Sequence, residues 1–174
     1  MGLEARLRAA IRDVPDFPKP GVVFKDITPV LLDPVLFADV VKAMAAPWRG
    51  KGVTHVLAIE SRGFLFGAPI ALELGAALVP VRKAGKLPSA RISERYALEY
   101  GEDVVEIHSD ALDSKSLVLI VDDVVATGGT AAATRRLAMR CGAGVVGISV
   151  LISLEFLPWR EAMRGVGAAV VMEY

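Results

Sequence analysis

Apolar and polar residues follow two alternating patterns along most of this chain. Short apolar runs bounded by turn residues indicate buried strands, and apolar positions three or four residues apart indicate helices. The runs predict strands at 54–60, 76–81, 103–108, 116–121, 143–152 and 168–174. The helical spacing predicts helices at 3–12, 34–48, 63–75, 129–140 and 155–164. Strands that alternate with helices predict an α/β fold built on a mostly parallel sheet.

Local signals support these elements. Asp33 and Pro34 stand where the second predicted helix needs a cap and a first residue, and Gly75 stands where the third one ends. The strand at 116–121 is apolar at every position after Ser116, which is typical of a parallel sheet covered on both faces. A chain of 174 residues without internal repeats predicts a single domain.

Two segments show neither the apolar runs of strands nor the spacing of helices. Residues 13–34 carry five of the ten prolines and predict mostly loop, because proline lacks the N–H group that helices and sheets use. Residues 82–101 are polar with little regular spacing, and a structureless stretch of this length is long for a loop in a compact domain. Such loops are often functional lids, so the second segment is a candidate lid.

Composition and charge narrow the possible functions. Hydrophobic residues make up 53% and charged residues 23% of the chain, which predicts a globular protein. Twenty basic and twenty acidic residues cancel, which argues against nucleic-acid or membrane binding through bulk charge. The single cysteine excludes an intrachain disulfide, and the first residues show no apolar signal-peptide core. We therefore expect a cytoplasmic protein with neither nucleic acid nor membrane as a partner.

The stretch VLIVDDVVATGGT, residues 118–130, carries the clearest candidate chemistry. Asp122 and Asp123 follow an apolar strand, and ligands of open parallel sheets bind at the carboxyl ends of strands. Thr127 to Thr130 then open a helix, where backbone N–H groups can bind an anion. Carboxylates accept hydrogen bonds from hydroxyls or face a divalent cation. Phosphate beside vicinal hydroxyls describes a ribose 5-phosphate, and a plain strand end followed by turn residues is the alternative.

This stretch resembles the phosphoribosyl-diphosphate (PRPP) motif of the type I phosphoribosyltransferase family. Four more stretches, FPKPGVVFKDITPVL, ESRGFLFG, VRKAGKLP and YALEYG, are similar to the adenine-specific branch of that family. The resemblance implies a central mostly parallel sheet flanked by helices, in a single domain with a small N-terminal hood at about 1–34 and a flexible lid loop at about 82–101. It also implies a purine salvage enzyme that uses magnesium to transfer the 5-phosphoribosyl group from PRPP to adenine, which yields AMP and pyrophosphate.

The same resemblance assigns residues to the parts of PRPP. Asp122 and Asp123 would hold the ribose hydroxyls, and they are candidate ligands for Mg²⁺, which PRPP itself would mainly hold. The 5-phosphate would bind Ala126, Thr127, Gly128, Gly129 and Thr130. The pyrophosphate would bind Ser61, Arg62, Arg82, Lys83 and Lys86, some of them across the interface of a homodimer. For these basic residues, an ordinary solvated surface is the alternative.

The candidates for adenine recognition lie in GVVFKD, and the candidate for acid–base catalysis lies in YALEYG. By resemblance, Phe24 stacks on the purine while the backbone of Val23 and Lys25 reads its amino edge; a plain core aromatic is the alternative for Phe24. Glu99 is the acid/base candidate, because adenine loses its N9 proton as it attacks and a carboxylate can stabilise the tautomer or cation that develops. An exposed strand glutamate is the alternative. Tyr100 either closes over the ribose or phosphate or packs within the lid.

Two other functions compete with this one. A sister enzyme for xanthine, guanine or a pyrimidine would need a side-chain donor or an acidic pair for the exocyclic oxygen, and no candidate matches as well as GVVFKD does for adenine. A PRPP-sensing transcriptional regulator would carry a DNA-binding module, whereas about 50 residues precede the first predicted strand of the sheet and the net charge is zero. The sequence therefore favours the adenine enzyme.

Overall fold

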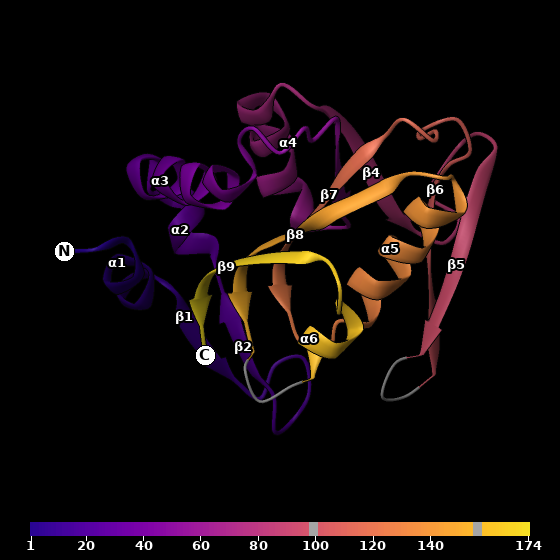
Figure 1. Ribbon diagram of the computed structural model, residues 1–174. Helices are drawn as coiled ribbons and strands as arrows, with labels where there is room; N and C mark the ends of the chain where they lie inside the picture. Colours follow the sequence, from indigo (N-terminus) through magenta and orange to yellow (C-terminus); the bar gives the residue numbers. More distant parts are fainter. Residues whose placement is uncertain (98–100, 155–157) are drawn as a thin grey trace. The chain divides into compact units, whose positions relative to one another are not determined.

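The computed structural model describes residues 1–97, 101–154 and 158–174, which form two compact units, Met1–Ala43 and Met44–Tyr174 (Figure 1). The N-terminal unit contains a short hairpin and helices, and the C-terminal unit contains the main sheet. The single domain with a hood at about 1–34 remains a prediction.

The N-terminal unit is more regular than its prolines suggest. Its elements are α1 (Leu3–Ala10), β1 (Arg12–Pro15), β2 (Val23–Asp26), α2 (Thr28–Leu32) and the start of α3 (Pro34–Ala45). Because β1 and β2 pair as an antiparallel hairpin and α2 follows them, the prediction of mostly loop for residues 13–34 is wrong. Strands of four residues are too short to show a clear alternation, so their pairing rather than their sequence pattern defines them.

Within the described part of the C-terminal unit, seven strands form one sheet in the order β5-β6-β4-β3-β7-β8-β9. The strands are β3 (His55–Ile59), β4 (Ala77–Lys83), β5 (Arg91–Ala97), β6 (Glu102–His108), β7 (Leu117–Val125), β8 (Gly144–Ser153) and β9 (Gly167–Glu173). Strands β4, β3, β7, β8 and β9 run parallel, and β6 and β5 continue the sheet antiparallel. The predicted α/β fold with a mostly parallel sheet is confirmed.

The described residues of this unit also form the 3-10 helix η1 (Ala46–Trp48), α4 (Gly63–Leu74), α5 (Gly129–Arg140) and α6 (Trp159–Ala162). Helices α4 and α5 cover opposite faces of the sheet. In β3, Leu57 and Ile59 belong to the same buried cluster as Leu137 of α5. Side chains alternate along a strand, and Ala58 accordingly lies against α4, where a Cβ added at Gly67 would be 2.4 Å from the Cβ of Ala58. Apolar packing on both faces explains why the central strands show no alternation.

Two predicted helix ends are confirmed. Asp33 caps α3, because its Oδ1 accepts hydrogen bonds from the backbone N–H groups of Val35 and Leu36, both at 3.0 Å. Gly75 follows α4 with a φ of 64°, the left-handed conformation that commonly ends a helix. Among the residues that the structure describes, none of the helices combines the length and the apolar character that crossing a bilayer requires.

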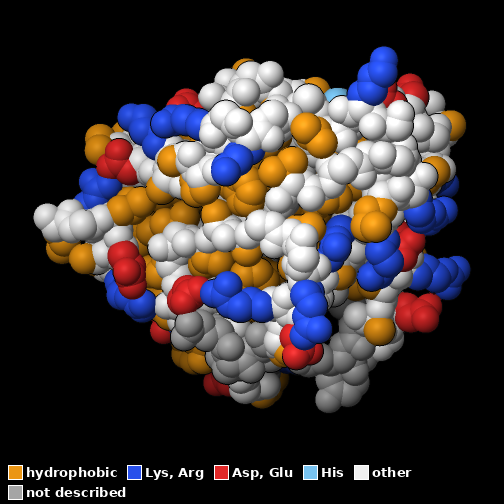
Figure 2. All heavy atoms as spheres, viewed as in Figure 1, with side chains coloured by type: hydrophobic (Ala, Val, Ile, Leu, Met, Phe, Trp, Pro, Cys, Tyr) orange, Lys and Arg blue, Asp and Glu red, His pale blue; other side chains and the backbone are white. Residues whose placement is uncertain are grey.

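The polar segment at 82–101 requires a second correction. Strand β5 occupies residues 91–97 and pairs with β6 along its whole length (Figure 1). The prediction of an irregular loop is therefore wrong for these residues, and a lid role for the segment remains a prediction. The polar side chains of β5 have partners on α5, since Glu94 forms ion pairs with Arg136 and Arg140. Figure 2 shows Lys and Arg side chains gathered over α5 and β5.

Candidate active site

The end of β7 and the start of α5 enclose a pocket of about 130 Å³. It is lined by Asp122, by the run from Val124 to Ala131 and by Ile148 of β8. The acidic pair lies inside β7, which continues to Val125 instead of ending before the pair as predicted. Pockets for whole ligands typically measure about 300–1,000 Å³, so this pocket suits a single group of a ligand, such as a phosphate.

The turn before α5 gives this pocket the character of an anion site. Gly128 is the N-cap of α5, with a φ of 82°, and its carbonyl oxygen accepts a hydrogen bond from the Ala132 N–H at 2.8 Å. The first N–H groups of a helix have no acceptor within the helix, and the helix dipole adds a partial positive charge there. All five predicted phosphate-binding residues, Ala126 to Thr130, line this pocket.

Asp122 and Asp123 have different surroundings. Asp122 lines the pocket, and its Oδ1 accepts a hydrogen bond from the backbone N–H of Asp123 at 2.9 Å. Burial, and after it the negative charge of Asp123, raise the pKa of Asp122 well above its ordinary value. Asp123 is buried and forms an ion pair with Arg62, whose Nε lies 2.9 Å from Asp123 Oδ2. One carboxyl of the pair therefore ionises less readily, while the other has a cationic partner.

Ser61 and Arg62 follow β3 and lie beside the acidic end of β7. A Cβ added at Gly63 would be 2.9 Å from a carbonyl oxygen of β7 and 3.0 Å from Asp122 Oδ1, so glycine allows the two segments to touch. The peptide bond between Glu60 and Ser61 is cis. The structure therefore brings the Arg62 segment together with the acidic pair, as a shared site for PRPP requires.

Glu60 organises the basic cluster at the end of β4, and the sequence reasoning missed this role. Its Oε2 accepts hydrogen bonds from Arg82 Nε at 3.0 Å and from the Lys83 backbone N–H at 2.8 Å. Burial raises the pKa of Glu60, but these bonds outweigh burial and the net pKa is lowered. A signal was present in the sequence, because an acid after one strand and a basic cluster at the end of the next meet when the two strands are parallel neighbours.

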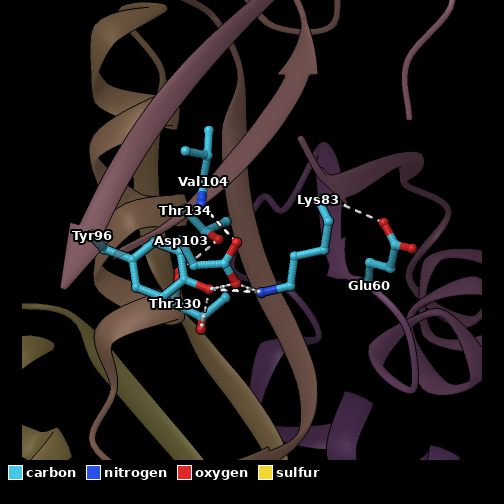
Figure 3. A network of polar contacts seen from close by, with 7 residues as sticks. All are labelled: Glu60, Lys83, Tyr96, Asp103, Val104, Thr130 and Thr134. Atoms are coloured by element: carbon cyan, nitrogen blue, oxygen red, sulfur yellow. Dashed lines mark hydrogen bonds and ion pairs between the residues drawn. The ribbon is translucent and has the colours of Figure 1, made fainter. Parts of the chain in front are cut away.

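The side chain of Lys83 points toward Tyr96 and Asp103 (Figure 3). Its Nζ donates hydrogen bonds to the Tyr96 hydroxyl, at 2.7 Å, and to Asp103 Oδ2. Burial lowers the pKa of Lys83, but its bonds to Asp103 and Tyr96 outweigh burial and the net pKa is raised. Among the predicted pyrophosphate-binding residues, Arg62 thus contacts the acidic pair, whereas the Lys83 side chain contacts Tyr96 and Asp103.

Lys86 lies in the turn between β4 and β5, and a buried carboxylate holds this turn. Glu106 is 5% exposed. It accepts hydrogen bonds from the Gly85 N–H at 3.0 Å, Ser93 Oγ at 2.9 Å and Arg91 Nε at 3.2 Å. Burial raises the pKa of Glu106, but these donors outweigh burial and the net pKa is lowered. The ionised form of Glu106 therefore stabilises the folded chain.

Replacing Glu106 with glutamine is expected to lower Tm at pH 7 by several degrees, because hydrogen bonds to charged groups contribute about 1.5–3 kcal/mol. Since folding lowers the pKa of Glu106, its stabilisation is present above the unfolded-state pKa and is lost as the pH falls through the folded-state pKa. The difference in Tm should therefore shrink below about pH 4. Thermal unfolding across this range measures it, with Glu102→Gln at an exposed position of β6 as the control. A difference as large at pH 3 as at pH 7 would contradict this role.

The adenine-binding candidates lie in β2 of the N-terminal unit. Val23 is exposed, and Phe24 packs edge-on against Phe17 with ring centroids 5.1 Å apart. Lys25 Nζ lies 2.7 Å from Asp13 Oδ1 as an ion pair. Contacts of these three residues with adenine remain predictions.

The connection from β5 to β6 carries the acid/base candidate Glu99 and the lid candidate Tyr100, and both lie outside the residues that the structure describes. The nearest described residues are Ala97 and Gly101, and Ala97 pairs with Glu102 across the hairpin. The carbonyl oxygen of Ala97 lies 3.5 Å from the position that a Cβ of Gly129 would take. Strand β5 therefore ends beside the turn that starts α5.

Residues 31–155 match the family described as the phosphoribosyl transferase domain. This region spans more than half of the chain and includes the acidic pair, the turn before α5 and the Arg62 segment. The chain therefore belongs to the phosphoribosyl transferase family.

Within this family, the chain is similar to adenine phosphoribosyltransferases. It is 62% identical over 155 residues to the enzyme of Myxococcus xanthus, with 89% of this chain and 84% of that protein covered. The crystal structure of the Rhodothermus marinus enzyme matches it with a TM-score of 0.95 at 48% identity, covering 99% of this chain and 98% of that chain. The Saccharomyces cerevisiae enzyme, a complex with adenine and an imino-altritol bisphosphate, matches with a TM-score of 0.92 at 36% identity over 98% of each chain. The resemblance to the adenine-specific branch and the type I fold are confirmed.

Proposed function

We propose that this protein transfers the 5-phosphoribosyl group from PRPP to adenine, which yields AMP and pyrophosphate in purine salvage. One observation supports this most strongly. The phosphate-sized pocket, the acidic pair and Arg62 lie together in a chain that is 62% identical to an adenine phosphoribosyltransferase. We also propose a cytoplasmic location, which the single cysteine favours.

PRPP carries three groups, and each has a proposed place in the C-terminal unit. The 5-phosphate binds the turn 126–130, the ribose hydroxyls bind Asp122 and Asp123, and the pyrophosphate binds Ser61, Arg62, Arg82, Lys83 and Lys86. The ion pair between Arg62 and Asp123 supports this arrangement. If PRPP binding separates this ion pair, Arg62 can pair with the pyrophosphate, and Asp123 can bind the ribose hydroxyls or a cation. Neither charge is then left buried and unpaired.

The acidic pair also fits a magnesium ion that is held mainly by PRPP. Across residues 1–97, 101–154 and 158–174, the structure gathers no three metal-ligating side chains at one point. Mg²⁺ commonly binds one or two carboxylates together with substrate phosphates. Asp122 and Asp123 can supply the carboxylates, and Asp123 Oδ2, although ion-paired with Arg62, accepts no aligned hydrogen bond from the described residues. When bound, the ion would neutralise part of the charge on the departing pyrophosphate.

The chemistry of the transfer places demands that these residues can meet. As the bond from ribose to pyrophosphate breaks, positive charge develops at the anomeric carbon and negative charge on the leaving group. Carboxylates beside the ribose stabilise the first, and Arg62 stabilises the second. Water would intercept the reactive carbon, so closure of the segment at 82–101 over the substrates would protect it.

We assign adenine to the GVVFKD segment and proton transfer to Glu99. Phe24 would stack on the purine, while the backbone of Val23 and Lys25 reads its amino edge. The ion pair that engages the Lys25 side chain with Asp13 supports a backbone contact over a side-chain contact. Glu99 would accept or share the N9 proton, and Tyr100 would close over the ribose or phosphate.

A second copy of this chain is the proposed partner. Leu65 and Leu72 are seven residues apart on α4, so they share one face, and they are 43% and 86% exposed. Leu78 of β4, 43% exposed, approaches the same helix near Gly67. Exposed apolar residues grouped in this way are typical of an interface. Sedimentation should give twice the 18.5 kDa mass of one chain, and a monomer at micromolar concentration would contradict the dimer.

A coupled assay tests the proposed function. The purified protein with adenine, PRPP and magnesium should release pyrophosphate and form AMP, while hypoxanthine and guanine should give far less product. Turnover of another base in preference to adenine would point to a sister enzyme. Binding of duplex DNA at physiological salt without AMP formation would point to a PRPP-sensing regulator.

A further inference from the structure

Tyr96 connects three elements around the turn that starts α5. It lies near the end of β5, is 6% exposed and belongs to the buried core cluster. Its hydroxyl lies 2.7 Å from Lys83 Nζ of β4, 3.0 Å from Asp103 Oδ2 of β6 and 3.1 Å from Thr130 Oγ1 of α5 (Figure 3). A core tyrosine with a polar end usually has a hydrogen-bond partner, but three partners from three elements make this hydroxyl a junction.

The chemistry of these partners fixes the direction of each hydrogen bond. An ionised carboxylate only accepts and an ammonium group only donates, whereas a tyrosine hydroxyl donates once and accepts on two lone pairs. The Tyr96 hydroxyl therefore donates to Asp103 and accepts from Lys83, and its remaining lone pair accepts from Thr130. The proton of the Thr130 hydroxyl points at Tyr96, so this threonine anchors the turn and does not donate to a ligand in this arrangement.

The ring of Tyr96 also contacts the turn directly. A Cβ added at Gly129 would be 3.3 Å from Tyr96 Cδ2, so the ring lies against the backbone of Gly129. Thr130, the residue after Gly129, is also held within α5, because Thr134 Oγ1 donates a hydrogen bond to its carbonyl oxygen at 2.9 Å (Figure 3). Tyr96 thus touches two consecutive residues at the N-terminus of α5, one through its ring and one through its hydroxyl.

We propose that Tyr96 is a positioning residue for the 5-phosphate of PRPP. Through Thr130 and Gly129 it holds the backbone N–H groups of the turn in the arrangement that binds phosphate. Its own position is set by Lys83 and Asp103 on two other strands. The proposal rests on the proposed function and adds that a hydroxyl outside the predicted binding set controls affinity for PRPP.

Steady-state kinetics of Tyr96→Phe test this, because the variant keeps the ring and removes only the hydroxyl. The variant removes all three bonds of the hydroxyl, of which the bond to Thr130 reaches the turn. KM for PRPP should therefore rise about three- to tenfold, the range expected for loss of that one hydrogen bond. Since Tyr96 touches neither the base nor the reacting carbon, kcat and KM for adenine should stay within about twofold. Tyr174→Phe is the matched control, because β9 precedes it at the opposite edge of the sheet from β5, and its kinetics should equal those of the parent.

The bond can also be removed from its other end. Thr130→Val should raise KM for PRPP to a similar extent. Adding Tyr96→Phe to it should cause no further rise, because the bond between Thr130 and Tyr96, the one that reaches the turn, is already absent. Thermal protection by PRPP reports the same loss of affinity if either variant is too unstable for kinetics at the usual temperature.

Three results would overturn the proposal: an unchanged or lower KM for PRPP in Tyr96→Phe, an equal rise in KM for adenine, or effects that multiply in the double variant. A lower KM would mean that Tyr96 competes with the phosphate for Thr130. If the parent protein itself makes no AMP and PRPP does not protect it from unfolding, the proposed function has failed instead.

Discussion

Replacing Gly128 with valine is expected to weaken PRPP binding by more than about 100-fold, since displacement of a binding group by 1 Å can cost this much. Gly128 has a φ of 82°, which a β-branched residue adopts only with strain. A Cβ there would also lie 3.1 Å from both Cα and Cβ of Trp159 and 3.2 Å from the Cβ of Ala162. Trp159 is 1% exposed and packed in the core, so we expect the strain at position 128 to shift the turn and its N–H groups with it.

The structure explains the need for glycine at position 128 differently from the sequence motif. A glycine in a phosphate-binding turn is expected where the backbone approaches the ligand closely. At Gly128, the atoms nearest to an added Cβ belong to α6. Two constraints therefore act on position 128: the conformation of the turn and the packing against α6.

Gly165→Val is the matched control for this experiment. Gly165 has a φ of 84°, close to that of Gly128, but no described atom lies within 4 Å of an added Cβ. Both variants carry the backbone strain and should lose stability, whereas only Gly128→Val should lose PRPP binding in calorimetry. Wild-type affinity in Gly128→Val, or an equal loss in Gly165→Val, would show that the turn does not bind the phosphate in this way.

Elements whose signals lie close together in the sequence could be predicted. Helix α5 has the bounds expected from its opening glycine and its apolar spacing, and Asp33 caps α3 through residues two and three positions away. The apolar strands were recognisable because they are buried on both faces. The turn before α5 and the acidic pair stand out in the sequence because backbone N–H groups at a helix start can bind an anion and carboxylates can bind hydroxyls or a cation. Their contacts with PRPP remain predictions.

Elements defined by distant partners could not be predicted. Strand β5 is polar, and only its pairing with β6 and the arginines of α5 make it a strand. Glu60 gained its role when β3 and β4 became neighbours, which places it at Arg82 and Lys83. The junction at Tyr96 joins side chains from four elements, between 7 and 34 residues from Tyr96 in the sequence. Patterns within a window of residues contain no information on such contacts until the order of strands is known.

Replacing Glu99 with glutamine is expected to lower kcat by about 10²- to 10⁴-fold, the range found for loss of general acid–base catalysis. Glutamine has nearly the shape of glutamate and can still hydrogen-bond the purine, but it cannot take up the N9 proton or balance positive charge on the ring. Ala97, the nearest described residue before Glu99, supports this assignment, because it lies against the turn at Gly129. Both KM values should change little, since the bound complexes keep their contacts.

Glu102→Gln provides the control for charge alone, because Glu102 starts β6 on the same hairpin and is exposed. It removes one carboxylate near the site and should leave kcat unchanged. Single-turnover measurements should assign the loss in Glu99→Gln to the chemical step, with adenine and PRPP still protecting the variant from unfolding. A fall in kcat of less than about threefold would remove Glu99 from acid–base catalysis. The proton would then pass to another group or directly to water, and the candidate lid at 82–101 would serve only to exclude solvent.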